Sequence, residues 1–409
     1  MEAKKTDLTR RKFIASSLGC LATAGLAGAP AGLTLAQDND QSGTTVEKEI
    51  IYRTLGKTGL KMPVVSMGVG PCNDPRVVQA CYEIGMRHFE TAAGYAFGRN
   101  EQILAGGLHK LGVRDKVFIT TKTLDAGQRR GLTTGEQYSK RLIETFEGSL
   151  RRLRTDYVDI LLIHGVGDAD TVANEAIINT LLELKKAGKT RSIGISTHGN
   201  MAAVINEAVR VGSYDVIQTS FNFTLADDTE LLTAIENAAS KGIGIIAMKT
   251  QAGGANFPNP DTLRQYDSVT VNSAALKWVL RNESVTTSVP AIPDYEIMRA
   301  AFAMARDLEY TEAEKNFLSD NSIKLSMGFC RQCRGCLATC PHNADVPTLM
   351  RTHMYATQYG SLQFARSALD EIETGRGLQV CTNCTECSAR CSNSVDIPRK
   401  IEDLKLIYS

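Results

Sequence analysis

The chain has 409 residues, which is long for one ordinary domain and long enough for a large core with an appended module. Its hydrophobic content of 43% is typical of a globular protein, and its formal net charge of +1 favours neither nucleic acid nor an anionic surface as a partner. We therefore expect a globular protein with more than one domain that does not bind nucleic acid.

The N-terminal segment has the pattern of a twin-arginine export signal. Arg10 and Arg11 stand in the sequence TRRKFI, and an uncharged, apolar stretch follows from Phe13 to about Ala36. Residues 1–36 are therefore predicted to be a signal peptide, and residues 37–49 a polar linker. We expect a periplasmic or extracytoplasmic protein. The apolar stretch is also long enough to span a bilayer, so an uncleaved membrane anchor is the alternative.

Residues 50–326 alternate short β-branched runs with amphipathic helical segments, which predicts a (β/α)8 TIM barrel. Eight strands are expected, at Pro63–Gly68, Arg87–Thr91, Val117–Lys122, Val158–His164, Ser192–Ser196, Val216–Ser220, Ile243–Met248 and Thr286–Pro290. Helices are expected between them, at Asn100–Leu111, Tyr138–Leu153, Ala173–Ala187, Met201–Val211, Thr229–Ser240 and Ser273–Leu280.

Two further observations support the barrel. Ile51–Arg53 and Leu60–Met62 resemble a hairpin that closes its floor. A doubly wound sheet is the competing architecture, but no Gly-x-Gly-x-x-Gly follows the first strand, which argues against a Rossmann dinucleotide site.

Four polar residues lie at or just after the ends of predicted strands, where barrel enzymes place their chemistry. Glu90 lies at the end of the second strand and Tyr95 follows it, Lys122 ends the third strand, and His164 ends the fourth. A carboxylate paired with Lys122 would hold an ammonium that lowers the phenol pKa of Tyr95. His164 would orient a substrate carbonyl, and Tyr95 would protonate the alkoxide that hydride attack creates.

Four segments that contain these residues resemble the aldo-keto reductase family. They are KTGLKMPVVSMGVG (57–70), FETAAGYAFGRNEQILAGGL (89–108), VFITTK (117–122) and SLRRLRTDYVDILLIH (149–164). The resemblance covers about residues 50 to 310. It implies that Tyr95 is the proton donor, Lys122 its activator and His164 the residue that orients the carbonyl. Glu90 stands where the family has aspartate, so the charge is kept on an arm that is one methylene longer.

The resemblance also implies a nicotinamide cofactor, NADP or NAD. It places Ser196, Gln218 and Asn222 against the nicotinamide. The family usually stacks an aromatic side chain on this ring after the seventh strand, but the sequence there is MKTQAGG, starting at Met248. After the eighth strand, acidic residues would repel a 2′-phosphate while Arg299 would attract it, so the choice between NAD and NADP stays open.

Eight of the eleven cysteines form two matching C-x2-C-x2-C-x3-C runs near the C-terminus. The runs are Cys330, Cys333, Cys336 and Cys340, then Cys381, Cys384, Cys387 and Cys391. This is the bacterial ferredoxin spacing and predicts two [4Fe–4S] clusters, each held by three cysteines of one run and the last cysteine of the other. Structural zinc and disulfides are the alternatives.

The segment between the two runs has a helical pattern, with helices expected at Thr348–Tyr359 and Leu362–Thr374. The two cysteine runs align with one another through Asp345 and Asp396, which indicates an internal repeat of two halves. Residues 327–409 resemble an α-helical dicluster ferredoxin module, and we expect them to form a small second domain.

Two functions fit these observations. The first is an exported iron–sulfur oxidoreductase that reduces a carbonyl or oxidises an alcohol with NAD(P), and whose clusters relay electrons to or from a partner protein. The second is a non-catalytic periplasmic electron-transfer or partner-binding protein that uses a degenerate barrel as its scaffold. Glu90 and the altered cofactor segment favour the second function. The presence of Tyr95, Lys122 and His164 favours the first.

Overall fold

The computed structural model describes residues 48–253 and 265–409, apart from the side chains of residues 324–326 and 383. The described residues belong to one compact unit, Lys48–Ser409. The predicted export signal and nearly all of the predicted linker lie outside them. The boundary expected near residue 326 coincides with the end of a helix, Asn321–Ser326, and otherwise stays a prediction.

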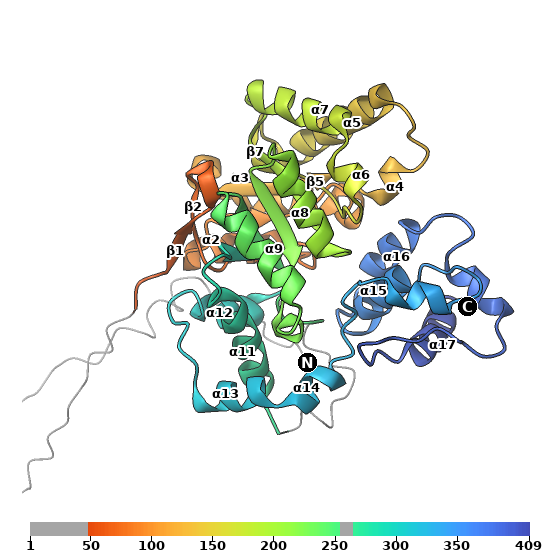
Figure 1. Cartoon of the computed structure of the whole chain (residues 1–409). Coiled ribbons are helices and arrows are strands. Elements are labelled where there is room, and N and C mark those ends of the chain that lie inside the picture. Colours follow the sequence, from red (N-terminus) through yellow and green to blue (C-terminus); the bar gives the residue numbers. More distant parts are fainter. Residues whose placement is uncertain (1–47, 254–264) are drawn as a thin grey trace, which may run out of the picture. The chain divides into compact units, whose positions relative to one another are not determined.

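Eight parallel strands form the barrel sheet, in the order in which they occur along the chain. Helices lie around these strands (Figure 1). The strands are β3 (Met67–Gly68), β4 (His88–Glu90), β5 (Phe118–Thr123), β6 (Val158–Ile163), β7 (Thr190–Thr197), β8 (Val216–Ser220), β9 (Gly244–Met248) and β10 (Thr287–Ser288). All eight predicted strands are present, which confirms the (β/α)8 fold class.

The barrel closes between its last strand and its first. Parallel bridges join Val65 to Ser288 and Gly68 to Ala291, and the Gly68 amide donates to the Pro290 carbonyl at 2.9 Å. A Cβ atom at Gly68 would lie 2.6 Å from that carbonyl oxygen, so the seam requires glycine at this position.

The predicted hairpin is also present, with β1 (Tyr52–Thr54) antiparallel to β2 (Lys61–Pro63). Pro63, the first residue of the predicted strand Pro63–Gly68, pairs with Tyr52 in this hairpin, and the first barrel strand begins at Met67.

Helices surround the strands and bury their apolar faces against them. They are α2 (Pro75–Ile84), α3 (Arg99–Leu111), α4 (Ala126–Arg129), α5 (Gly135–Leu153), α6 (Ala169–Val172), α7 (Glu175–Lys186), α8 (Met201–Val211), α9 (Thr229–Ser240), α11 (Ser268–Leu280) and α12 (Tyr295–Ala303). Most begin at a side-chain cap, and α5 begins with a capping box formed by Thr134 and Gln137. All six residues of β6 are buried, as expected for a parallel strand covered on both faces.

The chain leaves the barrel through α13 (Glu312–Ser319) and α14 (Asn321–Ser326) and enters a helical module of α15 (Val346–Thr357), α16 (Leu362–Asp370) and α17 (Ile397–Ile407), drawn in blue in Figure 1. Asp345 caps α15 and Asp396 caps α17, so the aligned residues of the two halves each start a helix. The helix expected to reach Thr374 ends at Asp370, because the chain turns there toward Gly375, whose φ is 85°.

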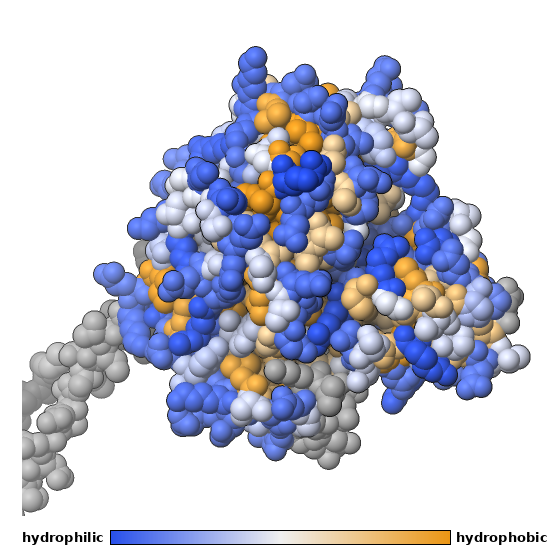
Figure 2. Space-filling view, viewed as in Figure 1, coloured by the Kyte–Doolittle hydropathy of each residue, from blue (hydrophilic) through white to orange (hydrophobic). Residues whose placement is uncertain are grey.

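Hydrophilic residues cover most of the face seen in Figure 2, and apolar residues show there as separate patches. Among the described residues, no helix has the length and apolar character needed to cross a bilayer.

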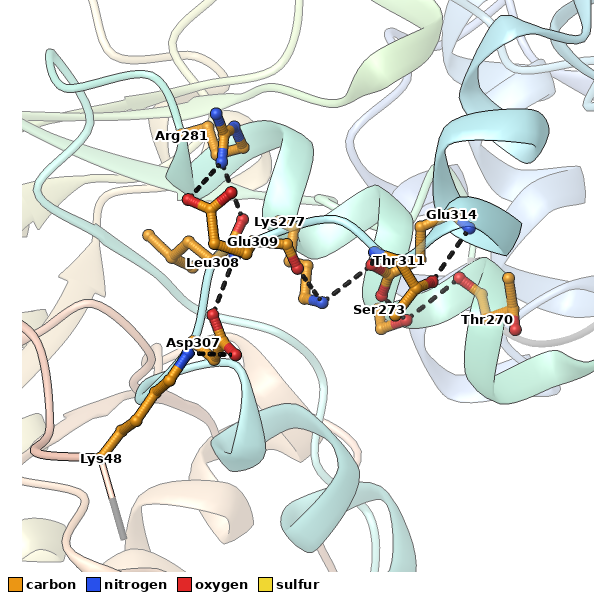
Figure 3. A network of polar contacts seen from close by, with 10 residues as sticks. All are labelled: Lys48, Thr270, Ser273, Lys277, Arg281, Asp307, Leu308, Glu309, Thr311 and Glu314. Atoms are coloured by element: carbon orange, nitrogen blue, oxygen red, sulfur yellow. Dashed lines mark hydrogen bonds and ion pairs between the residues drawn. The ribbon is translucent and has the colours of Figure 1, made fainter. Parts of the chain in front are cut away.

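A polar network fixes α11 to the segment that leads into the module (Figure 3). The Lys277 ammonium donates to Glu314 Oε2 at 2.8 Å and to the Glu309 carbonyl at 2.7 Å. Glu314 also accepts from Ser273 Oγ at 2.5 Å. Lys277 and Glu314 are 5% and 3% exposed, so each charge depends on the other for neutralisation.

We expect Glu314→Ala to lower the free energy of unfolding by about 3–5 kcal/mol, because it leaves the Lys277 ammonium buried without an anion. The exposed pair Lys315–Glu312 on the same helix gives the control: Glu312→Ala should cost about 1 kcal/mol or less. Urea denaturation of the two variants beside the parent protein measures both values. Equal costs for the two variants would contradict the importance of the buried pair.

Candidate functional site

A cavity of about 580 Å³ opens at the ends of the barrel strands where the chemistry was predicted. Glu90, Tyr95, His164 and Gln218 all line it, and Lys122 lies directly behind Glu90. The volume is within the usual range for small-molecule sites. The structure therefore brings the four predicted catalytic residues together at one mouth.

The Lys122 ammonium is completely buried and contacts Glu90 Oε1. It also donates to the Thr91 carbonyl at 2.8 Å, and Gln218 Nε2 donates to the same Glu90 oxygen at 2.9 Å. The glutamate therefore reaches the lysine despite its longer arm, and the Gln218 amide holds its carboxylate in place.

Burial lowers the pKa of Lys122, and the nearby positive charge of Lys249 lowers it further. The Glu90 carboxylate opposes both effects, because an adjacent anion favours the charged amine. The ion pair therefore maintains a positive charge beneath the cavity floor.

Tyr95 and His164 face one another beside this charge. Their rings meet edge to face with centroids 5.7 Å apart, and Lys122 Nζ lies 4.6 Å from the centre of the Tyr95 ring. His164 Nδ1 is buried and has no hydrogen-bond partner among the described residues. Burial and several neighbouring cations, of which Lys122 is the strongest, hold the pKa of His164 well below its usual value. The imidazole is therefore neutral at neutral pH.

The structure corrects one expectation about Tyr95. Its pKa is raised rather than lowered, because burial disfavours the phenolate, and Tyr355, Tyr359 and Glu371 add to this effect. The ammonium of Lys122 lies over the ring face, where it does not outweigh these effects. Tyr95 therefore holds its proton firmly at neutral pH.

The three predicted nicotinamide contacts differ in their surroundings. Gln218 lines the cavity, and its Oε1 is buried without a hydrogen-bond partner among the described residues. Ser196 Oγ instead accepts from the Gly165 amide at 3.1 Å. The Asn222 side chain caps a short 3-10 helix, Phe223–Leu225, and donates to the Lys249 carbonyl at 3.2 Å. Of the three, only Gln218 has a free polar atom that is placed to meet a ligand.

The C-terminal module provides one wall of the cavity, which the sequence did not predict. Tyr355 comes from α15, Tyr359 lies just after that helix, and Phe364 comes from α16. The Phe364 ring packs on Tyr95 with centroids 5.2 Å apart. No local pattern marks these residues, because their role depends on how the module docks.

Arg351 of α15 anchors the module to the barrel. Its Nη1 lies 2.8 Å from His198 Nδ1, and its Nη2 contacts Glu371, just after α16. His198 and Glu371 also line the cavity, so this bridge connects the module to the walls of the site.

The eight cysteines of the two runs gather into two sets of four, each around a small cavity of about 20 Å³. One set is Cys330, Cys333, Cys336 and Cys391, and the other is Cys340, Cys381, Cys384 and Cys387. These are the sets that the ferredoxin spacing predicted. Among the described residues, no three acidic, His or Cys side chains are arranged to hold a single metal ion. Such an arrangement is not needed in a cubane, where each thiolate binds a different iron.

A third small cavity lies between the barrel mouth and the first cysteine set. His198 and Lys249 border both this cavity and the large one, while Cys330 borders both this cavity and its own cysteine set. The Cys330 set is therefore next to the site. The described residues that line the Cys381 cavity all belong to the module.

Comparisons with known protein families match two parts of the chain. Residues 73–268 match the aldo/keto reductase family, and residues 329–396 match a 4Fe-4S dicluster domain. The second match covers both cysteine runs.

Two individual relatives and one solved structure are also similar to this chain. An L-galactose dehydrogenase of Arabidopsis thaliana is 33% identical over 221 residues, which are 50% of this chain and 67% of that protein. The methylglyoxal reductase DkgB of Salmonella typhimurium is 29% identical over 267 residues, which are 64% of this chain and 93% of that protein. The holo form of the Bacillus halodurans aldo-keto reductase AKR11C1 has the same fold, with a TM-score of 0.54 and 22% identity over 66% of this chain and 95% of that one.

The barrel, its polar mouth and these relatives lead to one conclusion: the chain belongs to the aldo/keto reductase family, and it is an oxidoreductase of that family with a C-terminal 4Fe-4S dicluster domain.

Proposed function

We propose that this protein is an exported enzyme that reduces a small carbonyl compound, or oxidises the corresponding alcohol, with NADP or NAD, and that two [4Fe–4S] clusters in its module relay electrons to or from a redox partner protein. The observation that carries the proposal is the gathering of Tyr95, His164 and the Glu90–Lys122 ion pair around one cavity in the barrel mouth.

The protein's part in carbonyl reduction is to orient the substrate and to supply a proton. Neutral His164 provides an imidazole N–H that can donate to the carbonyl oxygen. Tyr95 then gives its phenol proton to the oxygen as negative charge develops there. The buried Lys122 ammonium stabilises the charge that remains on the phenol oxygen. One hydride, which carries two electrons, and this one proton convert the carbonyl to an alcohol.

The cavity fits the carboxamide end of a nicotinamide, because Gln218 Oε1 is a buried acceptor that has no partner in the described part of the chain. A nicotinamide supplies the hydride when it is bound. Gln218 would hold its carboxamide, while Ser196 and Asn222 act through the backbone that their side chains already fix.

Replacing Tyr95 by phenylalanine tests the chemical part of the proposal. The variant should lose about 10²–10⁴-fold in kcat for carbonyl reduction, because it lacks the acid that quenches the alkoxide. Its affinity for NADH and NADPH should stay close to the parent value. The measurements are steady-state kinetics with a panel of aldehydes and ketones, and fluorescence titration with each nucleotide.

Tyr310→Phe is the matched control, since Tyr310 packs against Arg281 away from the cavity. Full reductase activity in Tyr95→Phe would exclude this mechanism. Failure of the cluster-loaded parent to bind either nucleotide would favour the non-catalytic electron-transfer protein instead.

The two cysteine sets support the relay. A nicotinamide gains or loses two electrons together, while each cluster carries one, so a pair of clusters matches the two-electron change. The Cys330 set borders the small cavity beside the barrel mouth, so it would be the cluster nearer to the substrate. The Cys381 set would be the one nearer to a redox partner.

Anaerobically purified protein should contain about eight irons per chain, as two [4Fe–4S] clusters require.

The crossed ligand sets give a sharper test. Changing Cys330 and Cys391 together to alanine should remove one cluster and leave about four irons, because both residues belong to the same set. Changing Cys330 and Cys340 together should damage both clusters. Zinc without iron in the parent protein would contradict the assignment. So would damage to both clusters in the Cys330/Cys391 variant together with loss of only one cluster in the Cys330/Cys340 variant.

Export by the twin-arginine route fits a cluster-bearing protein, because this pathway moves proteins that are already folded and loaded. The sequence TRRKFI and the apolar stretch after it support this proposal. Replacing Arg10 and Arg11 by lysine should leave the protein in the cytoplasm, as cell fractionation would measure. Unchanged export would show that these arginines do not form the signal.

A further inference from the structure

Lys249 is a cation of the cavity wall that the catalytic proposal does not use. It is the first residue after β9, and it lines the same cavity as Tyr95 and His164. Its backbone is left-handed, with φ of 54°. Residues other than glycine and asparagine rarely adopt this conformation, and such strained positions cluster at ligand sites.

The Lys249 ammonium has no anionic partner in the described part of the chain. It lies 5.6 Å from the centre of the Tyr355 ring and makes no hydrogen bond or ion pair with any described residue. The Glu371 carboxylate, whose negative charge acts on Lys249, is in contact with Arg351. A partly buried cation without a counter-charge is costly, and an anionic ligand would remove that cost.

Further polar groups near Lys249 also lack partners. Ser220 Oγ and Arg351 Nε are buried without hydrogen bonds among the described residues, and both residues border the small cavity that Lys249 shares. Ser220 and Arg351 are 2% and 6% exposed. Lys249 therefore borders the large cavity and shares the small cavity beside it with two residues that carry donors without acceptors. Buried donors without acceptors indicate that an acceptor is missing nearby.

We propose that Lys249 binds an anionic group, a carboxylate or a phosphate, on the molecule that occupies the cavity. This inference rests on the proposed function for the identity of that molecule. The anion comes either from an acid group of the carbonyl substrate or from a phosphate of the dinucleotide. Tyr355 packs beside the ammonium, so the iron–sulfur module takes part in ligand recognition.

The other cations of the cavity wall are less suited to this role. Arg152 is bound to Glu101, with 2.7 Å between Nε and Oε2. Arg151 is exposed at the rim. Lys122 lies behind the wall and is neutralised by Glu90. Lys249 is therefore the lining cation that is both partly buried and free of a carboxylate.

Lys249→Met tests the inference by calorimetric binding to the intact, cluster-loaded protein, which does not depend on turnover. The probes are a 2-oxo acid, its uncharged amide, inorganic pyrophosphate and NADH. At least one anionic probe should bind about 10- to 100-fold more weakly to the variant, as expected for a lost hydrogen bond to a charged group. The uncharged amide should be unaffected. Lys249→Arg should restore most of the affinity.

The control variant is Lys241→Met, an exposed lysine that precedes the other end of β9. Weaker binding of the oxo acid alone assigns the anion to the substrate, and weaker binding of NADH and pyrophosphate assigns it to the nucleotide. If the parent binds no anionic probe, or Lys249→Met binds them all as the parent does, the inference is wrong. Failure of the proposed function is seen separately, as absence of carbonyl turnover by the parent.

The pH dependence gives a second readout. Burial, followed by the positive charge of Arg351, lowers the pKa of Lys249 to about 7, while Glu371 raises it. Lys122, His164, His198 and Tyr355 complete the titratable surroundings. The ammonium is present below this pKa and is lost above it, so affinity for the anionic probe should fall as the pH rises through about 7. Lys249→Met should lack this dependence.

Discussion

The buried ammonium of Lys122 is the constraint around which the rest of the site is arranged. A charge that is completely removed from water needs an anion and further hydrogen bonds, or it is lost. Glu90 provides the anion, the Thr91 carbonyl provides an acceptor, and Gln218 fixes the carboxylate from the opposite side of the barrel. These residues come from different strands, so the closed barrel itself is what makes the charge tolerable. The longer side chain of Glu90 is accommodated because Gln218 Nε2 donates a hydrogen bond to its carboxylate.

The docking of the iron–sulfur module is the second condition for the site. Arg351 joins His198 of the barrel to Glu371 of the module, and Phe364 covers Tyr95. Without these contacts the barrel mouth would lose one wall of its cavity. The module therefore has a structural role in the site, independent of any role in electron transfer. The same contacts place Cys330 beside the cavity rather than at a remote end of the molecule.

The sequence predicted the parts of this arrangement that follow from local rules. Glu90, Lys122 and His164 could be found because parallel strands of a barrel end at one mouth, and the cysteine sets could be found because their spacing encodes the ligands. The strand-end rule applies to Lys249 as well, because it directly follows β9. Tyr355, Phe364 and Arg351 could not be found, since their positions depend on the docking of helices distant in sequence. The raised pKa of Tyr95 escaped prediction for the same reason, because residues of the module contribute to it.

The protonation states of Tyr95 and His164 suit the proton-donating step of carbonyl reduction. A phenol whose pKa is raised keeps its proton at neutral pH and is ready to donate it to an alkoxide. Alcohol oxidation would instead need the Tyr95 phenolate as a base, and burial, Tyr355, Tyr359 and Glu371 all oppose that charge. Neutral His164 suits the same direction, because it donates a hydrogen bond to a carbonyl without adding a positive charge beside Lys122. Tyr355, Tyr359 and Glu371 all belong to the module, so its docking contributes to keeping the Tyr95 phenol in its acid form.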